Sequence, residues 1–214
     1  MTNRSKPSPQ SDEELAQAKS RSDQLRKIIR PLPDPRYLVD VGLTYIESQL
    51  EYFRKEYGLD LIPEFQRGHV WSQEQQIAFI EGMLRNTVKG SGLVIEFNAP
   101  SWRGSQAAGD LSEEIQVIDG LQRLTSVRLF MDGKLHPFGL SVSDLKGTEF
   151  NPARSIFGLK FAVHSFCWKK DLLQYYIDIN SGGTPHSQEE ILRVKKLMET
   201  CEKKESRNRI KNSN

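Results

Sequence analysis

IQVIDGLQRLTSVRLF, residues 115–130, is the stretch from which the fold class follows. Its first five residues include three β-branched apolar side chains, as in a short buried strand, and Asp119-Gly120 then ends the run. The apolar residues after this break return at helical spacing: Leu121, Leu124, Val127, Leu129 and Phe130. Elsewhere strands and helices alternate without a regular strand–helix–strand series, so we predict an α+β protein with a small mixed sheet and surrounding helices.

The junction between this strand and this helix carries a polar cluster of Asp119, Gln122, Arg123 and Thr125. Unpaired backbone N–H groups and the positive end of the helix dipole favour an anion at a helix start. Gly120 lets the backbone turn sharply and lets a ligand approach, because it has no Cβ atom. The planar guanidinium of Arg123 can donate several hydrogen bonds to a phosphate. Gln122 could orient water, and Asp119 is a candidate Mg²⁺ ligand or general base. We therefore predict a nucleotide-phosphate site with Asp119, Gln122 and Arg123 as its catalytic residues.

Each candidate near this site also has a purely structural interpretation. Residues 119–120 could form a plain turn, because Asp-Gly is a common turn dipeptide. His69 could act as a general acid or base, although an ordinary loop histidine is the simpler interpretation, and His164 is expected to be structural or exposed. Glu64 is a second candidate carboxylate, and Trp71 is expected to anchor the core rather than to stack on a base.

Residues 115–130 also resemble the Asp-Gly-Gln-Gln-Arg signature of the family named for the N-terminal domain of GmrSD type IV restriction enzymes. Residues 62–71 resemble that family's Ile-Pro-x-x-Gln-Arg-x-x-x-Trp element, and residues 176–184 resemble its Asn-x-Gly-Gly turn before a terminal helix. The three motifs agree in order and spacing, and the resemblance extends over residues 43–198. One departure is Leu121, which stands where the family usually has the first glutamine.

The resemblance implies a ParB/sulfiredoxin-like fold, in which loops at one end of a small sheet bind nucleotide phosphates. It also implies hydrolysis of nucleoside triphosphates, which in relatives is coupled to a separate nuclease domain and to sensing of DNA modification in phage defence. Gln66 and Arg67 of the first motif, with Asn180 and Gly183 of the third, are then further candidates for nucleotide contacts.

Three classes of function follow from these observations. The first is a stand-alone NTP-hydrolysing domain, since no His-Asn-His nuclease pattern occurs near the end of the chain. The second is a DNA-binding module without catalysis, favoured by a basic end at residues 195–209 but opposed by the net charge of only +2. The third is a regulatory module that binds an effector or defence protein and has lost turnover through Leu121.

Composition sets the outer limits of these interpretations. The 214 residues suffice for one domain, and we expect it at residues 37–200, between a mobile polar segment with a Pro-rich linker (1–36) and a basic tail (201–214). The two cysteines have neither metal spacing nor the pattern of a disulfide framework. The sequence offers no membrane-spanning run and no signal peptide, so we expect a cytoplasmic protein without a membrane partner.

The periodicity of the remaining sequence predicts the other elements. A helix is expected from Val39 to Gly58, because Leu43, Ile46, Leu50 and Phe53 recur at helical spacing. Ser72 and Gln75 form a capping box that begins another helix, and Ser187 with Glu190 forms a second. Further strands are expected at 59–62, 93–97 and 158–164, a helix at 170–179, a loop at 98–114 and irregular chain at 140–152.

Overall fold

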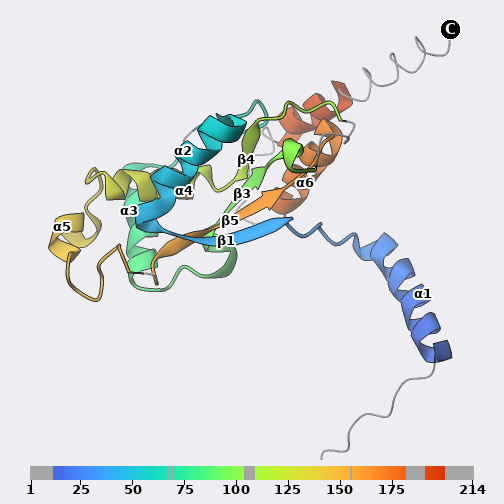
Figure 1. Ribbon diagram of the computed structural model, residues 1–214, viewed down its shortest axis with the longest axis horizontal. Helices are drawn as coiled ribbons and strands as arrows, with labels where there is room; N and C mark the ends of the chain where they lie inside the picture. Colours follow the sequence, from blue (N-terminus) through green and yellow to red (C-terminus); the bar gives the residue numbers. More distant parts are fainter. Residues whose placement is uncertain are drawn as a thin grey trace, which may run out of the picture. The chain divides into compact units, whose positions relative to one another are not determined.

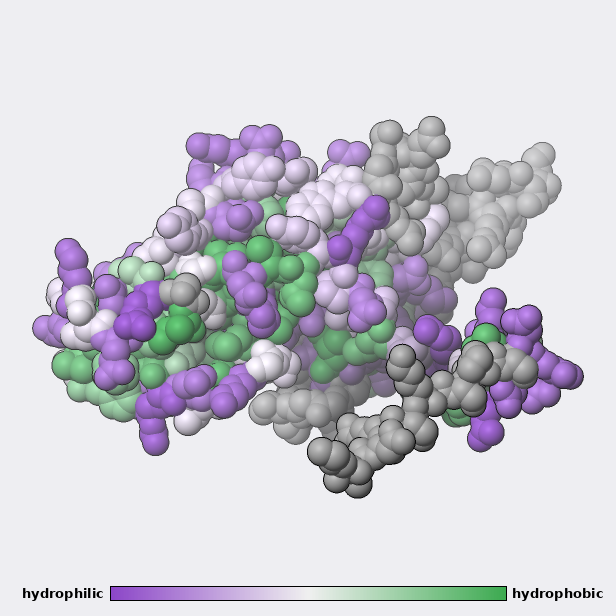
Figure 2. All heavy atoms as spheres, turned by 60° about the horizontal axis from the view of Figure 1, so that its bottom comes forward, coloured by the Kyte–Doolittle hydropathy of each residue, from purple (hydrophilic) through white to green (hydrophobic). Residues whose placement is uncertain are grey.

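The computed structural model describes residues 12–66, 68, 70–103, 109–154, 156–181 and 191–200. The chain divides into two compact units, Met1–Pro33 and Asp34–Asn214. The first contains α1 (Asp12–Ile29), whose acidic first turn and basic last turn complement the helix dipole. Every described residue of α1 is exposed, including the apolar Leu15 and Ile28. Most of the described surface of this helix is hydrophilic (Figure 2).

The second unit is built on a five-stranded mixed sheet with the strand order β1-β5-β3-β4-β2. Figure 1 labels β1, β5, β3 and β4. Strand β5 is antiparallel to β1 and parallel to β3, and β4 is antiparallel to β3 and parallel to β2. The predicted α+β class with a small mixed sheet is therefore confirmed. The strands are β1 (Tyr37–Gly42), β2 (Leu59–Asp60), β3 (Val94–Asn98), β4 (Ile115–Asp119) and β5 (Gly158–His164).

Helices cover both faces of this sheet. The longer ones are α2 (Ile46–Tyr57), α3 (Gln73–Leu84), α4 (Leu121–Met131) and α6 (Lys169–Ser181), α5 (Val142–Leu145) is a single turn, and residues 191–200 are helical. Short 3-10 turns occur at Leu43–Tyr45, Gly90–Leu93, Pro100–Arg103 and Pro137–Gly139. Among the described helices, none has the length and apolar character that a bilayer crossing requires.

The two faces of the sheet bury two separate apolar clusters. Ile95 and Phe97 of β3 join the larger cluster, which includes residues of α2, α3 and α4. Ile118 of β4 instead joins a smaller cluster with Leu172 and other residues of α6. Since side chains alternate along a strand, Glu96 of β3 lies on the face that α6 covers.

The helix predicted from Val39 is wrong at its beginning. Residues 37–42 form β1, which pairs with β5 at the sheet edge, and α2 begins only at Ile46. Val39 and Val41 suit a strand because they are β-branched, and pairing with a distant strand overrides the helical spacing. The predicted end of that helix is confirmed, since Gly58 follows α2 with a φ of 69°.

Smaller differences concern element ends. The capping box of Ser72 and Gln75 is confirmed at the start of α3. Strand β2 stops at Asp60, two residues before the predicted end, and the expected irregular stretch contains α5, which a capping box at Ser141 begins. The second predicted capping box, at residues 187–190, and the basic tail lie outside the described residues.

Candidate functional site

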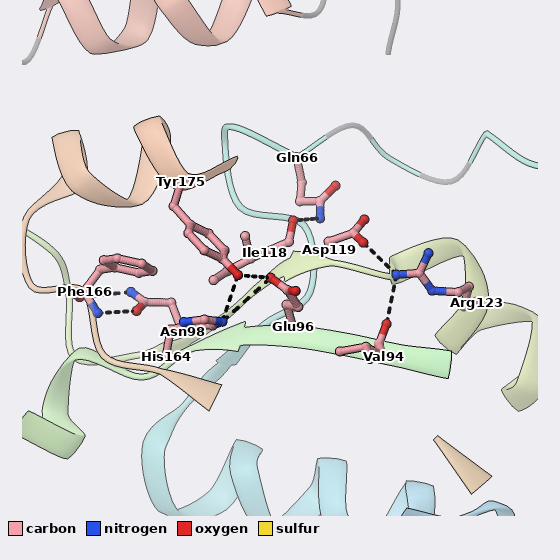
Figure 3. A network of polar contacts seen from close by, with 10 residues as sticks. All are labelled: Gln66, Val94, Glu96, Asn98, Ile118, Asp119, Arg123, His164, Phe166 and Tyr175. Carbon is pink, nitrogen blue, oxygen red and sulfur yellow. Dashed lines mark hydrogen bonds and ion pairs between the residues drawn. The ribbon is translucent and has the colours of Figure 1, made fainter. Parts of the chain in front are cut away.

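A β-bulge in β4 sets the direction of the Asp119 side chain. Phe97 of β3 lies opposite Val117, but Glu96 lies opposite Asp119, so Ile118 is an extra residue in β4. In a regular strand Asp119 would share a face with Val117. Because residues opposite each other in a sheet share a face, the bulge places Asp119 beside Glu96, on the side of α6 (Figure 3).

Asp119 forms an ion pair with Arg123 across the start of α4. Nη2 of Arg123 lies 2.6 Å from Oδ2 of Asp119 and also donates to the backbone oxygen of Val94, at 2.8 Å (Figure 3). The Arg123 side chain is 20% exposed and that of Asp119 is 37% exposed, so water reaches the pair. The Nε atom of Arg123 is buried and has no hydrogen-bond partner among the described residues. Because this atom is enclosed, its hydrogen-bonding capacity is unused in the described part of the structure.

Gly120 permits the sharp turn between β4 and α4. Its φ of 92° lies in the left-handed region, which side chains other than glycine rarely adopt. A Cβ atom at this position would lie 2.8 Å from Cδ1 of Ile95, 3.0 Å from the oxygen of Val94 and 3.1 Å from Nη2 of Arg123. The glycine therefore serves both the turn and the close packing of Arg123 against β3. In the described part of the chain, no side chain caps the first turn of α4.

Two glutamines attach the segment after β2 to this junction. Nε2 of Gln66 donates to the backbone oxygen of Ile118 at 2.7 Å. Oε1 of Gln122 accepts from the backbone N–H groups of Val70 and Trp71, at 3.0 and 3.1 Å, and its Nε2 donates to the oxygen of Gly68 at 3.0 Å. The Gln122 amide is therefore occupied largely by the backbone, which makes this residue a positioning group for Gly68, Val70 and Trp71.

The other side of the same segment is held by the last described helix. Arg193 donates from Nη1 to the backbone oxygen of Glu64 at 2.6 Å and from Nη2 to that of Phe65 at 2.9 Å. The Glu64 carboxylate forms an ion pair with Lys169 of α6. Phe65 is buried in the smaller apolar cluster, where its ring contacts Tyr176. Residues 64–66 are thus fixed to both α6 and β4.

Glu96, which lies opposite Asp119, forms a network of polar contacts with Tyr175 and His164. The hydroxyl of Tyr175 on α6 donates to Oε2 of Glu96 at 2.8 Å and lies 3.1 Å from Nε2 of His164 on β5 (Figure 3). The His164 nitrogen lies 3.8 Å from the same Glu96 oxygen. Asn98 exchanges two hydrogen bonds with the backbone of Phe166, whose ring stacks on His164.

Burial dominates the pKa values in this network. It lowers the pKa of His164 to about 4, so the imidazole is neutral near pH 7. Burial also raises the pKa of the Glu96 carboxyl, the nearby charge of Asp119 adds to this effect, and the Tyr175 hydroxyl and Arg123 oppose it. The pKa of Tyr175 is raised, first by burial and then by the charge of Glu96. Tyr175 therefore stays protonated and donates to Glu96.

Comparison with known protein families shows to which family this chain belongs. The family model described as the N-terminal domain of the GmrSD restriction endonuclease matches residues 49–166 of the 214-residue chain. The chain belongs to this family. Comparisons with curated proteins and with solved structures return no match. As a member of the GmrSD N-terminal domain family, the chain is a module of a restriction-related group, and the match includes both the 62–71 and the 115–130 motifs.

The structure brings two of the three family motifs together. Gln66, Asp119, Gly120, Gln122 and Arg123 lie at one junction through the contacts above. Thr125 is half-buried one turn into α4. Asn180 is buried near the end of α6, where its amide nitrogen donates to the backbone oxygen of Tyr176 at 2.7 Å. Arg67, His69 and Gly183 lie outside the described residues.

Two other positions bear on what the site can do. Leu121, where the family usually has a glutamine, is 6% exposed and packs in the larger apolar cluster. Its side chain is therefore part of the core. Trp71 is partly buried against the same cluster, with its ring 5.6 Å from that of Phe79, as expected for a core anchor.

The arrangement of carboxylates limits the kind of metal site that is possible. Among the described residues, no group of three or more His, Cys, Asp or Glu side chains gathers that could hold a metal by itself. Mg²⁺ commonly binds through one or two carboxylates and completes its coordination with water and substrate phosphates. Asp119, partly exposed and beside Glu96, fits that kind of site.

Sequence reasoning missed three of the residues that build this region. Glu96, Tyr175 and Arg193 occur in no family motif, and their roles depend on contacts between segments far apart in the chain. A weak signal existed for Glu96, because it is a charged residue inside the apolar strand 93–97. His164 was expected to be structural or exposed, and it is 3% exposed inside the network.

Proposed function

We propose that the junction of β4 and α4 binds the phosphates of a nucleoside triphosphate and hydrolyses it. One observation carries the proposal: Gln66 and Gln122 join the two family motifs around the Asp119–Arg123 ion pair, directly at the start of α4. A helix start without a side-chain cap, next to the partly exposed and permanently charged Arg123, is a favourable environment for phosphate oxygens.

The chemistry assigned to each residue follows from its contacts. Arg123 would bind phosphate oxygens and stabilise the negative charge that develops on them during transfer. Asp119 would hold Mg²⁺, which supplies charge neutralisation at the phosphates when bound. Gln122 would keep Gly68, Val70 and Trp71 against α4. Arg67 of the first motif is proposed as a second phosphate donor. Leu121 packs in the core and is given no role at the phosphates in this proposal.

In the family context, we propose that turnover serves a restriction or phage-defence system through a separate effector protein. DNA is proposed as the regulator, because relatives of this kind act on DNA. A DNA-binding module without catalysis is the alternative, and salt dependence separates the two. Binding that relies on phosphate contacts to DNA weakens steeply as salt is raised.

The test is phosphate release from a panel of nucleoside triphosphates with Mg²⁺, with and without duplex DNA. Arg123→Ala should lose a charge-assisted bond of about 1.5–3 kcal/mol, which corresponds to a loss of affinity of roughly tenfold or more. Arg128→Ala is the matched control, since Arg128 also lies on α4 but pairs with Glu47 instead. A folded Arg123→Ala variant that binds and hydrolyses nucleotide like the wild type would refute the site.

A further inference from the structure

Arg193, on the last described helix (191–200), belongs to none of the three family motifs. Its Nη1 atom donates to the backbone oxygen of Glu64 at 2.6 Å, and its Nη2 atom donates to that of Phe65 at 2.9 Å. The planar guanidinium presents these donors side by side, and hydrogen bonds from a charged donor are stronger than those from a neutral one. Among the described residues, these contacts of Arg193 are to the backbone and not to a carboxylate.

The two backbone oxygens belong to a turn at the first family motif. The Gln66 N–H donates to the oxygen of Pro63 at 2.8 Å, which is the hydrogen-bond pattern of a β-turn. Because a peptide group is planar, the oxygen of Phe65 and the nitrogen of Gln66 lie in one rigid unit. A donor that fixes this oxygen therefore also fixes the direction in which the chain leaves the turn at Gln66.

The Gln66 side chain connects this turn to the proposed phosphate site. Its Nε2 atom donates to the backbone oxygen of Ile118 at 2.7 Å, and that oxygen belongs to the peptide group that Ile118 shares with Asp119 (Figure 3). Arg193, the turn and the Gln66 amide thus form a continuous series of hydrogen bonds that ends at the backbone of Asp119. A displaced turn would release this backbone next to the ion pair with Arg123.

The helix that carries Arg193 is attached to the domain by other contacts. Val194 is fully buried in the smaller apolar cluster, which also contains Phe65 and residues of α6. Leu197 and Met198 pack against the same cluster. Arg193 itself is exposed. Removal of its guanidinium should therefore leave the helix in place and change mainly the turn.

We propose that Arg193 is a positioning residue of the phosphate site, which acts through the 63–66 turn and the Gln66 amide. The inference rests on the proposed binding and hydrolysis of a nucleoside triphosphate at the start of α4. In this assignment Arg193 does not touch the substrate, but it holds the turn so that the backbone beside Asp119 keeps its place. Catalysis depends steeply on such placement, because a displacement of about 1 Å can cost about 10²-fold in rate. The helix at 191–200 thus influences turnover through its attachment to the first motif.

The experiment is a double-mutant cycle of Arg193→Ala and Gln66→Ala, measured by steady-state phosphate release from ATP and GTP with Mg²⁺. Urea titration of each variant checks that it is folded under the assay conditions. We expect Arg193→Ala to reduce kcat/KM by about 10–10²-fold when Gln66 is present. In the Gln66→Ala background the same substitution should reduce kcat/KM by less than about twofold, because the contact through which it acts is already lost. A merely structural role would lower the free energy of unfolding without this dependence on Gln66.

Lys196→Ala is the matched control. Lys196 is exposed on the same helix, so its replacement removes an equal charge and leaves the hydrogen bonds of Arg193 in place. Its kcat/KM should stay within about twofold of the wild-type value. A loss as large as that of Arg193→Ala would assign the effect to the charge of the helix and overturn the positioning role. If Arg193→Ala does not fold, Arg193→Met, which keeps the apolar stem of the side chain, replaces it in the cycle.

The possible results distinguish a failure of this inference from a failure of the proposed function. An Arg193→Ala variant with wild-type kcat/KM would overturn the role of Arg193 and leave the proposed function standing. An equal loss with and without Gln66 would do the same, because Arg193 would then act by another route. A wild type that releases no phosphate from ATP or GTP would overturn the proposed function for these nucleotides and the inference with it.

Discussion

Replacing Gly120 with alanine should destabilise the protein by about 2–5 kcal/mol. Adopting a φ of 92° costs a residue with a Cβ atom about 1–2 kcal/mol. The new methyl group would also lie within 3.1 Å of Ile95, Val94 and Arg123, and overpacking of this kind costs about 1–3 kcal/mol more. The free energy of unfolding, measured by urea titration followed by circular dichroism, gives the total.

Gly133 provides a matched control at the other end of α4. Its φ is 72°, but a Cβ atom there would meet nothing within 4 Å, so Gly133→Ala should cost only the backbone contribution of about 1–2 kcal/mol. The difference between the two variants therefore isolates the close packing around Gly120. If the two free energies agree within about 0.5 kcal/mol, the usual scatter of such comparisons, the packing argument is wrong.

Two further predictions concern the glutamine contacts and the buried histidine. Gln122→Ala removes three hydrogen bonds to a partly exposed segment, so it should cost about 1–3 kcal/mol and speed hydrogen exchange of the Val70 and Trp71 amides. Burial lowers the pKa of His164 from 6.5 to about 4 in the folded chain. Between these values the unfolded chain binds more protons than the folded one. The free energy of unfolding should therefore fall by about 2–3 kcal/mol as the pH drops from 7 to 4. Urea titrations across this range should show a flatter dependence for His164→Gln, and an equal slope in both proteins would contradict the assignment.

The elements that the sequence predicted correctly depend on local interactions. The β4–α4 junction combines a short apolar strand, an Asp-Gly break and a helical period within sixteen residues. The capping box at Ser72 and the glycine that ends α2 are likewise decided by neighbours three to five residues away. These signals remain valid in the folded chain because they depend on residues that are close in the sequence.

The features that the sequence could not predict depend on long-range pairing. β1 forms because Val39 and Val41 pair with β5, more than one hundred residues later, although the local spacing favoured a helix. The hydrogen-bond network of His164, Tyr175 and Glu96 forms only because β3, β5 and α6 lie next to one another. Predicting either feature requires the register of the sheet.

The same limit applies to the roles of the motif residues. Gln122 was a candidate for orienting water and Gln66 for a nucleotide contact, and the residue types alone allow these roles. In the folded chain the Gln66 amide binds the backbone of Ile118, and the Gln122 amide binds the backbone of Gly68, Val70 and Trp71. Whether a glutamine acts on a substrate or on the chain itself depends on how closely two separate loops approach, and sequence spacing does not give this distance.

The extra residue in β4 decides on which face of the sheet the Asp119 side chain lies. With one extra residue between Val117 and Asp119, Asp119 lies opposite Glu96. Without this bulge, Asp119 would lie on the same face as Val117, against the larger apolar cluster. An insertion or deletion of one residue in β4 would therefore reverse the side of the carboxylate without altering any motif residue. If the Asp-Gly-x-Gln-Arg motif were transferred to a strand without the bulge, the aspartate would point into the larger apolar cluster. The count of residues has to be transferred together with their identity.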